Sequence, residues 1–241
     1  MSEAPKAVTA SYTVSNTVQL ASNGFALRLD RKSGKRFAYN AGQFAMVTVT
    51  DKDTGEQRTK PLSFSSTPTD PDMLEFGYEK RGYFTQALSK LKAGDVVTLR
   101  APLGFFTYPD TEAGPLVLLA GGTGIAPIMG MLRSFHYNKK ENPVTLLYSC
   151  RAEEDFLFRS EIEQLFSVHD HWTLHLTVTQ GDAKEGVMQG RLTPETARRY
   201  HKRLTDPLYF LCGPPAMIQD LIKALTIEGV DRDRILTEQY E

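Results

Sequence analysis

Hydrophobic positions along this chain follow one pattern before Tyr108 and another after it. The first hundred residues hold short runs of β-branched and aromatic residues, separated by Gly, Pro, Asn and Asp. These runs predict strands over 8–20, 25–29, 43–50, 60–66, 73–78 and 96–100, and the spacing over 83–91 predicts a helix. Many short strands at this spacing indicate a small antiparallel barrel or sandwich.

After residue 108, and a loop over 111–115 that resembles a linker, strand and helix patterns alternate. Strands are predicted over 116–120, 143–149, 173–179 and 208–212, and helices over 125–138, 154–168, 193–203 and 214–228, before a short last segment over 234–240. This alternation is typical of a parallel sheet with helices on both faces. The predicted fold is an N-terminal antiparallel β-barrel domain (1–109) followed by a doubly wound α/β domain (115–241), with a ligand cleft between them.

Residues 116–132 contain the most informative stretch, an uncharged apolar run interrupted by Gly-Gly-Thr-Gly at 121–124. A strand, a glycine turn and a helix in this order place backbone N–H groups where a phosphate binds. The turn matches neither the GxGxxG fingerprint nor a P-loop. A membrane span would need about 20 uninterrupted apolar residues, so we set that interpretation aside. A tight turn without a ligand remains the alternative.

Composition narrows the class of protein. A length of 241 residues suits one large or two modest domains, and a net charge of −1 without a basic block argues against nucleic acid or an anionic membrane surface as partner. Cys150 and Cys212 are too few for a four-thiolate cluster, and no metal site is expected. The N-terminus lacks the apolar core of a signal peptide, so we expect a cytoplasmic protein without membrane insertion.

A second small-residue turn follows the predicted strand 208–212 and has the sequence Cys-Gly-Pro-Pro at 212–215. The carboxyl ends of parallel strands meet at one edge of a sheet, so Thr123 and Cys212 are expected on the same rim. Most free cysteines are small buried hydrophobes, and that remains the alternative for Cys212. In the first half, Lys60 precedes a hydroxyl-rich segment, and residues 81–85 open a helix with a glycine. A capped surface helix and a solvated lysine are the alternatives to an anion site there.

Together these segments resemble the ferredoxin–NADP reductase superfamily. Its Arg-x-Tyr-Ser/Thr signature corresponds to Lys-Pro-Leu-Ser at 60–63, its Gly-x-x-Ser/Thr turn to 82–85, and its Gly-Gly-Thr-Gly-Ile-Ala-Pro run is unchanged at 121–127. Cys-Gly-Pro-Pro at 212–215 and Glu-x-aromatic at 238–240 complete the match. Two positions depart from the family. Lys60 offers a point charge where the family arginine offers a planar fork, and Leu62 would cover the flavin with an aliphatic side chain.

The resemblance implies which residues form the sites. Flavin-binding positions are Lys60, Pro61, Leu62, Ser63, Tyr78, Gly82, Tyr83, Phe84, Thr85 and Tyr240. NAD(P)-binding positions are Gly122, Thr123, Gly124, Arg151, Cys212, Gly213 and Pro214. Ser63, Cys212 and Glu238 would be catalytic, with Ser63 beside flavin N5 and the other two orienting the nicotinamide.

The implied cofactor is FAD rather than FMN, with NADH or NADPH as co-substrate. Relatives that use NADPH commonly carry Ser/Thr-Arg after the third nucleotide-domain strand; residues 177–181 hold no arginine, which favours NADH, although Arg151 and Arg159 offer charge. The implied activity is hydride transfer from NAD(P)H to flavin, followed by electron delivery to a separate iron–sulfur protein or flavodoxin. The alternatives are a reductase of diffusible flavin and a non-enzymatic redox-sensing subunit.

Overall fold

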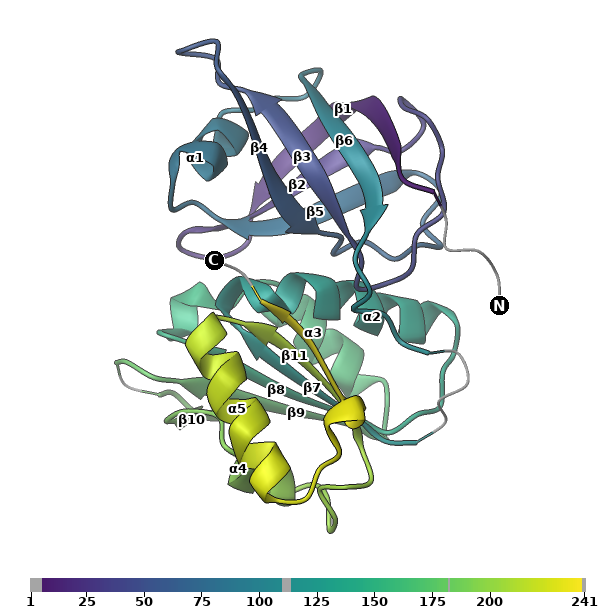
Figure 1. Cartoon of the computed structure of the whole chain (residues 1–241). Helices are drawn as coiled ribbons and strands as arrows, with labels where there is room; N and C mark the ends of the chain where they lie inside the picture. The colour runs from purple at the N-terminus through teal and green to yellow at the C-terminus, as the bar shows by residue number, and fades with distance from the viewer. Residues whose placement is uncertain (1–5, 110–113, 182, 240–241) are drawn as a thin grey trace.

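The computed structural model describes residues 6–109, 114–181 and 183–239 and contains two stacked sheets (Figure 1). The first is a six-stranded antiparallel barrel of order β4-β3-β6-β1-β2-β5. Its strands are β1 (Val8–Gln19), β2 (Gly24–Asp30), β3 (Phe44–Thr50), β4 (Gln57–Ser63), β5 (Met73–Glu79) and β6 (Val96–Leu103). We refer to the described residues up to 109 as the barrel.

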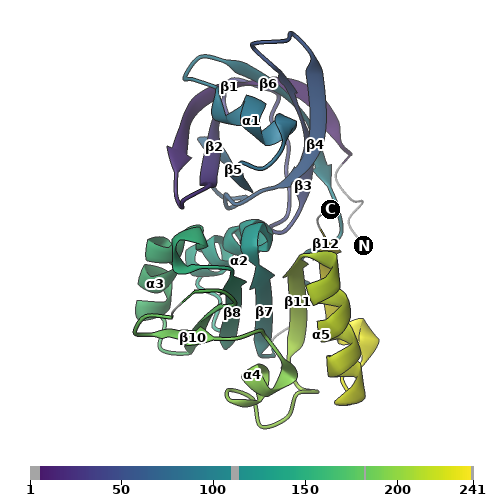
Figure 2. The same ribbon diagram turned by 90° about the vertical axis from the view of Figure 1, so that its left-hand side faces the viewer.

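Alternating side chains fill the barrel core, and one isolated bridge closes the barrel. In β5, Leu74, Phe76 and Tyr78 point into the barrel core, while the residues between them face the other half of the molecule. A bridge between Phe64 and Phe76 brings the two edge strands together. Helix α1 (Tyr83–Ser89), which Figure 2 shows against the barrel, belongs to the same half. Its residue Phe84 is buried in the barrel core.

The second sheet is parallel throughout and has the order β10-β9-β8-β7-β11-β12. Its strands are β7 (Leu116–Gly121), β8 (Val144–Cys150), β9 (Trp172–Val178), β10 (Val187–Gln189), β11 (Leu208–Gly213) and β12 (Ile235–Gln239). All of β7 is buried, as its unbroken apolar sequence predicts. The strand order reverses between β7 and β11, and ligands of such sheets bind outside the strand ends at that point.

Helices cover both faces of this sheet. Helices α2 (Ile125–Tyr137) and α3 (Arg159–Ser167) share one hydrophobic cluster, and α4 (Pro194–Arg198) and α5 (Pro215–Ile227) share the other. Figure 2 shows α2 directly beneath the barrel, with α5 on the opposite face of the sheet. We call the described residues from 114 onward the α/β half. No helix among the described residues combines the length and apolarity needed to span a membrane.

The predicted fold class is confirmed, and the differences concern element boundaries and one short strand. Strand β4 covers 57–63 rather than 60–66, and α4 ends at Arg198 rather than at 203. Helix α3 starts at Arg159 rather than at 154, because residues 153–155 form a 3₁₀ turn and Phe158 has a left-handed φ of 58°. Strand β10 was not predicted, and the terminal segment 234–240 contains strand β12. Most of the predicted linker and Tyr240 lie outside the described residues.

Candidate functional site

The glycine turn after β7 and the Cys-Gly turn after β11 lie against each other. Strands β7 and β11 pair in parallel, with Ala120 opposite Cys212. A methyl group on Gly124 would lie 2.1 Å from the carbonyl oxygen of Cys212, so the two backbones approach as closely as a glycine allows. The prediction that Thr123 and Cys212 share one rim of the sheet is therefore confirmed.

Three side chains expected to be catalytic converge at this rim. Cys212 is fully buried, and in the register of β11 and β12 it pairs with Glu238. The hydroxyl of Ser63 donates a hydrogen bond to Oε1 of Glu238 over 2.8 Å, although the two residues are 175 positions apart. The end of β4 in the barrel is thus joined to the last strand of the α/β half beside Cys212.

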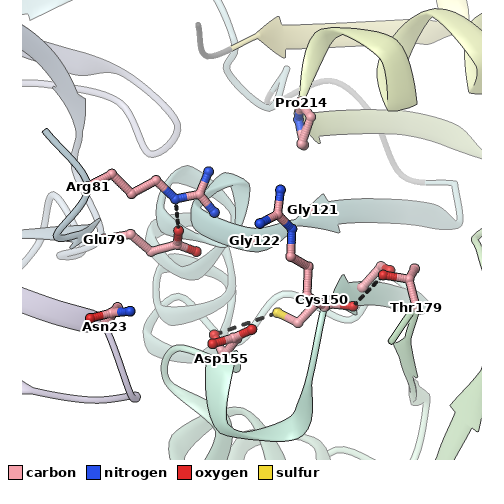
Figure 3. Close-up of a pocket in the computed structure, with 12 residues that line it drawn as sticks. Asn23, Glu79, Arg81, Gly121, Gly122, Cys150, Asp155, Thr179 and Pro214 are labelled. Atoms are coloured by element: carbon pink, nitrogen blue, oxygen red, sulfur yellow. Dashed lines mark hydrogen bonds and ion pairs between the residues drawn. The ribbon is translucent and has the colours of Figure 1, made fainter. Parts of the chain in front are cut away.

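A pocket of about 390 Å³ opens between the two halves (Figure 3). The barrel contributes Asn23, Glu79 and Arg81, and the α/β half contributes Gly122, Arg151 and Pro214. Inside it, Arg81 Nε and Glu79 Oε2 form an ion pair of 2.5 Å. Because both halves supply walls, the shape of the pocket depends on how they are held together.

Cys150 also lines this pocket, but its thiol is unreactive. Burial is the main influence on its thiol and raises the pKa to about 12. Its Sγ lies 3.6 Å from the carbonyl oxygen of Asp155. A thiol with this pKa is protonated at neutral pH, so Cys150 is not a nucleophile.

The two arginines considered for a coenzyme 2′-phosphate differ in their surroundings. Arg151 is exposed and lines the pocket. Arg159 forms ion pairs with Glu153 at 2.9 Å and Glu163 at 2.8 Å, and its guanidinium lies over the ring of Phe156. Arg159 is therefore engaged within its own half, which leaves Arg151 as the stronger candidate.

On the barrel side, the predicted flavin positions form an exposed surface with a buried edge. Lys60 and Pro61 are exposed, Leu62 is half-buried against the barrel core, and Ser63 is buried. Tyr83 is 73% exposed at the start of α1.

The other predicted flavin positions have structural neighbours of their own. The hydroxyl of Thr85 accepts hydrogen bonds from the N–H groups of Arg81 and Gly82 and closes the first turn of α1. Phe84 is buried in the barrel core. Tyr78 stacks on Phe25 there; burial raises the pKa of its hydroxyl, which has no hydrogen-bond partner in the part of the chain that the structure describes. The side chains of Phe84 and Tyr78 thus serve the core.

Arg58 also belongs to this surface, although the sequence motifs did not identify it. It lies two residues before Lys60 in β4, so strand alternation places both cations on one face. Its guanidinium is 5.2 Å from the centre of the Tyr83 ring, and it forms a 2.6 Å ion pair with Glu56. The two-residue spacing from Lys60 was the signal that could have found it. Two cations, an exposed aromatic ring and the Ser63 hydroxyl are groups suited to contact a flavin ring and its phosphates.

Two oxidoreductase family models match the chain. An oxidoreductase FAD-binding domain matches residues 7–108, and an oxidoreductase NAD-binding domain matches residues 118–223. Their boundary coincides with the change from the antiparallel to the parallel sheet. The chain belongs to the ferredoxin–NADP reductase superfamily of FAD- and NAD-binding oxidoreductases.

Individual relatives agree with this placement. NADH-cytochrome b5 reductase 1 of Lodderomyces elongisporus is 32% identical over 188 residues, which cover 77% of this chain and 62% of the relative. Reductase component 2 of terephthalate 1,2-dioxygenase from Comamonas sp is 29% identical over 205 residues, covering 85% and 60%. The chain spans less than two thirds of both curated relatives.

Among solved structures, the flavohem-like FAD/NAD-binding domain of nitric oxide dioxygenase from Vibrio cholerae superposes with a TM-score of 0.86 at 25% identity. The match covers 95% of this chain and 98% of that chain.

Proposed function

We propose that this chain is a flavin-dependent NAD(P)H oxidoreductase that passes hydride from NAD(P)H to bound FAD, and then electrons to a separate one-electron carrier. Residues 1–109 would form the flavin domain and 115–241 the coenzyme domain. The observation that carries the proposal is the hydrogen bond from Ser63 to Glu238 beside Cys212. It brings together the three residues that hydride transfer between two bound cofactors would require.

The chain's own groups would bind and orient, while FAD supplies hydride acceptance and stepwise electron release. Lys60 and Arg58 would attract the flavin phosphates, and Ser63 would offer its hydroxyl to the ring edge. Backbone N–H groups of the turn Gly122–Gly124 would bind the coenzyme pyrophosphate at the start of α2. Cys212 and Glu238 would form the wall that orients the nicotinamide.

NADH is the coenzyme that the pocket favours. Residues 177–181 carry no arginine, and Arg159 is held by two carboxylates. Only Arg151, of the two candidates, is exposed in the pocket. Arg81, the other cation among the residues that line the pocket, is ion-paired with Glu79, and Arg151 by itself is a weak site for a 2′-phosphate.

An iron–sulfur protein or a flavodoxin is the proposed electron acceptor. The chain has two cysteines, both buried, so it cannot itself hold a four-thiolate cluster. One relative bears the name of a dioxygenase reductase component and another that of a cytochrome b5 reductase. These names support a protein acceptor, and the first of them supports an oxygenase component.

The first test is an absorbance spectrum of the purified protein, followed by anaerobic titration with NADH and then NADPH. Bleaching of a bound flavin is expected. Stopped-flow flavin reduction is then compared in Ser63→Ala and Cys212→Ala, each expected to be slower by about 10²–10³-fold. Ser167→Ala is the matched control, because its hydroxyl bonds Gln164 at the exposed end of α3. Wild-type rates in both site variants would overturn the assignment.

A reductase of diffusible flavin is the second candidate. Leu62 stands where the family has tyrosine, so the ring would lose an aromatic cover and be held less tightly. Flavin that stays bound through purification would decide against this candidate. If neither coenzyme bleaches a bound flavin, the third candidate, a non-enzymatic redox-sensing subunit, replaces both.

A further inference from the structure

Helix α2 contacts both halves of the candidate site. It begins at Ile125, directly after the turn Gly122–Gly124. One side of the helix then lies against the barrel where β4 ends. A methyl group on Gly130 would lie 2.7 Å from the carbonyl oxygen of Phe64 and 3.2 Å from that of Ser66. The helix backbone is therefore packed directly on the segment that follows Ser63.

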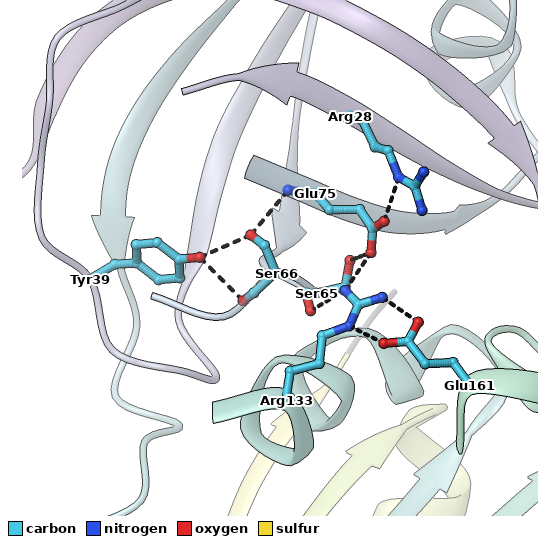
Figure 4. Close-up of polar contacts among 7 residues, drawn as sticks. All are labelled: Arg28, Tyr39, Ser65, Ser66, Glu75, Arg133 and Glu161. Carbon is cyan, nitrogen blue, oxygen red and sulfur yellow. Dashed lines mark hydrogen bonds and ion pairs between the residues drawn. The ribbon is translucent and has the colours of Figure 1, made fainter. Parts of the chain in front are cut away.

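Arg133, on the same helix, adds polar contacts between α2 and the barrel (Figure 4). One terminal nitrogen donates hydrogen bonds to the carbonyl oxygen of Ser65 at 2.7 Å and to Glu75 at 2.6 Å, both in the barrel. The other two nitrogens bind Glu161 of α3, each at 2.7 Å. The guanidinium also lies 5.2 Å from the centre of the Phe158 ring. Its side chain is only 14% exposed, so these contacts are largely shielded from water.

Glu75 is the most buried member of the cluster that it forms with Arg28, Arg133 and Glu161. Its side chain is fully buried and accepts hydrogen bonds from Arg28 at 2.8 Å and from the Ser65 hydroxyl at 2.9 Å. Burial by itself would raise the pKa of Glu75, but Arg133 and Arg28 more than offset it and hold the pKa below its usual value. Two carboxylates and two guanidiniums make the cluster neutral. Buried ion pairs of this kind add little net stability, but breaking one is costly, which makes them suited to fixing one arrangement.

We propose that Arg133 is a positioning residue, which holds the Ser63 segment of the barrel in register with the nucleotide turn at the start of its own helix. The inference rests on the proposed function. Gly124 and Arg133 are nine residues apart, so the helix spans roughly 14 Å between the two contacts as a rigid body. Loss of the Arg133 hydrogen bonds to the barrel lets Ser63 shift relative to Glu238 and Cys212. A shift of about 1 Å slows a positioned reaction on the order of 100-fold.

The test compares Arg133→Met with Glu161→Gln. The control variant removes one partner of the same guanidinium and leaves both barrel contacts, to Ser65 and Glu75, in place. Gly130→Ala is a third variant, which wedges the helix away from Phe64 without changing a charge. It keeps the test decisive should Arg133→Met fail to fold.

Two measurements are made. In flavin-free protein, Arg133→Met and Gly130→Ala are expected to speed hydrogen exchange of the Ser65 amide, which bonds the carbonyl oxygen of Glu75. In flavin-loaded protein, both are expected to slow saturating flavin reduction by 10- to 100-fold, with NADH dissociation constants within threefold of wild type. Glu161→Gln is expected to stay within twofold in both measurements.

Wild-type exchange and wild-type reduction rates in Arg133→Met or, if it does not fold, in Gly130→Ala would overturn the positioning role. A rate loss confined to weaker NADH binding would overturn it as well. A wild-type protein whose bound flavin is bleached by neither NADH nor NADPH instead refutes the proposed function, which the Arg133 variants do not test.

Discussion

Replacing Gly124 by alanine tests whether the close approach of the two turns matters for both folding and chemistry. Gly124 has an ordinary helical φ of −59°, so alanine is allowed there and would stabilise most helical positions. The obstacle is space alone. The new methyl group would lie 2.1 Å from the Cys212 oxygen, 2.4 Å from its carbonyl carbon and 2.8 Å from the Gly213 nitrogen.

The size of the effect follows from these distances. Contacts of a side-chain methyl group below 3.0 Å essentially do not occur, so the turns must separate by about 0.9 Å (3.0 − 2.1). The obstructing atoms are backbone and cannot rotate away. Overpacking of this kind costs about 1–3 kcal/mol, and each kcal/mol lowers Tm by roughly 2–4 °C at this chain length. A displacement near 1 Å is also expected to slow hydride transfer on the order of 100-fold.

The assay is thermal unfolding together with stopped-flow flavin reduction at saturating NADH. Gly121→Ala is the matched comparison, because its methyl group would meet the flexible end of Met217 at 2.7 Å and the ring of Pro214 at 2.9 Å. We expect it to lose less stability and less rate than Gly124→Ala. If Gly124→Ala matches wild type in both measurements, or ranks above Gly121→Ala, the contact between the turns does not set the geometry of the site.

Three further predictions concern flavin binding, pH and coenzyme choice. Arg58→Met is expected to weaken FAD binding roughly tenfold, the loss expected for one charge-assisted hydrogen bond to a phosphate, and to leave riboflavin affinity unchanged. Fluorescence titration will check this, with Arg203→Met as the control, and equal losses for FAD and riboflavin would contradict a phosphate contact. Burial, reinforced by Arg199, holds the pKa of His175 below 6.5, so the folded state disfavours the protonated form. The free energy of unfolding should be unaffected by His175 above pH 6.5 and should decrease as the pH falls below it. In urea unfolding between pH 7 and 5.5, the free energy of unfolding should therefore depend less on pH in His175→Gln than in wild type. The ratio of kcat/KM for NADH to that for NADPH is expected to exceed one and to rise in Arg151→Ala; a ratio below one would reverse the coenzyme assignment.

Much of the fold could be predicted because the two halves carry different and strong periodicities. The unbroken apolar strands β7 and β8 are typical of a sheet buried on both faces, and both are buried throughout. The missed elements lack such signals. Strand β10 has three residues, of which only Val187 is buried, and the first residues assigned to α3 instead pass through the left-handed Phe158. That conformation is unfavourable for a phenylalanine and depends on contacts from elsewhere in the chain, including Arg133 over its ring.

Some features of the candidate site could likewise be predicted from the sequence, and others could not. The shared rim of Thr123 and Cys212 follows from parallel topology, and the meeting of Ser63 with Glu238 agrees with the family motifs. Arg133 could not be recognised, because a single charge near the end of an apolar helix resembles a solvated residue. Its partner Glu75 is 58 positions away, in strand β5 of the barrel. Contacts made only when two separately patterned halves dock leave no local signature in either.

The hydrophobic cluster beneath the barrel has a consequence for how this protein can be engineered. Ala26 of β2 and Phe106, which follows β6, belong to the same buried cluster as α2 and α3. The two halves therefore share a core, and a barrel expressed by itself would present an apolar face to water. We expect the chain to unfold in one cooperative transition and its isolated halves to aggregate. A chimera that exchanges one half for that of a relative would have to carry over Ala26, Phe106 and the residues facing them together.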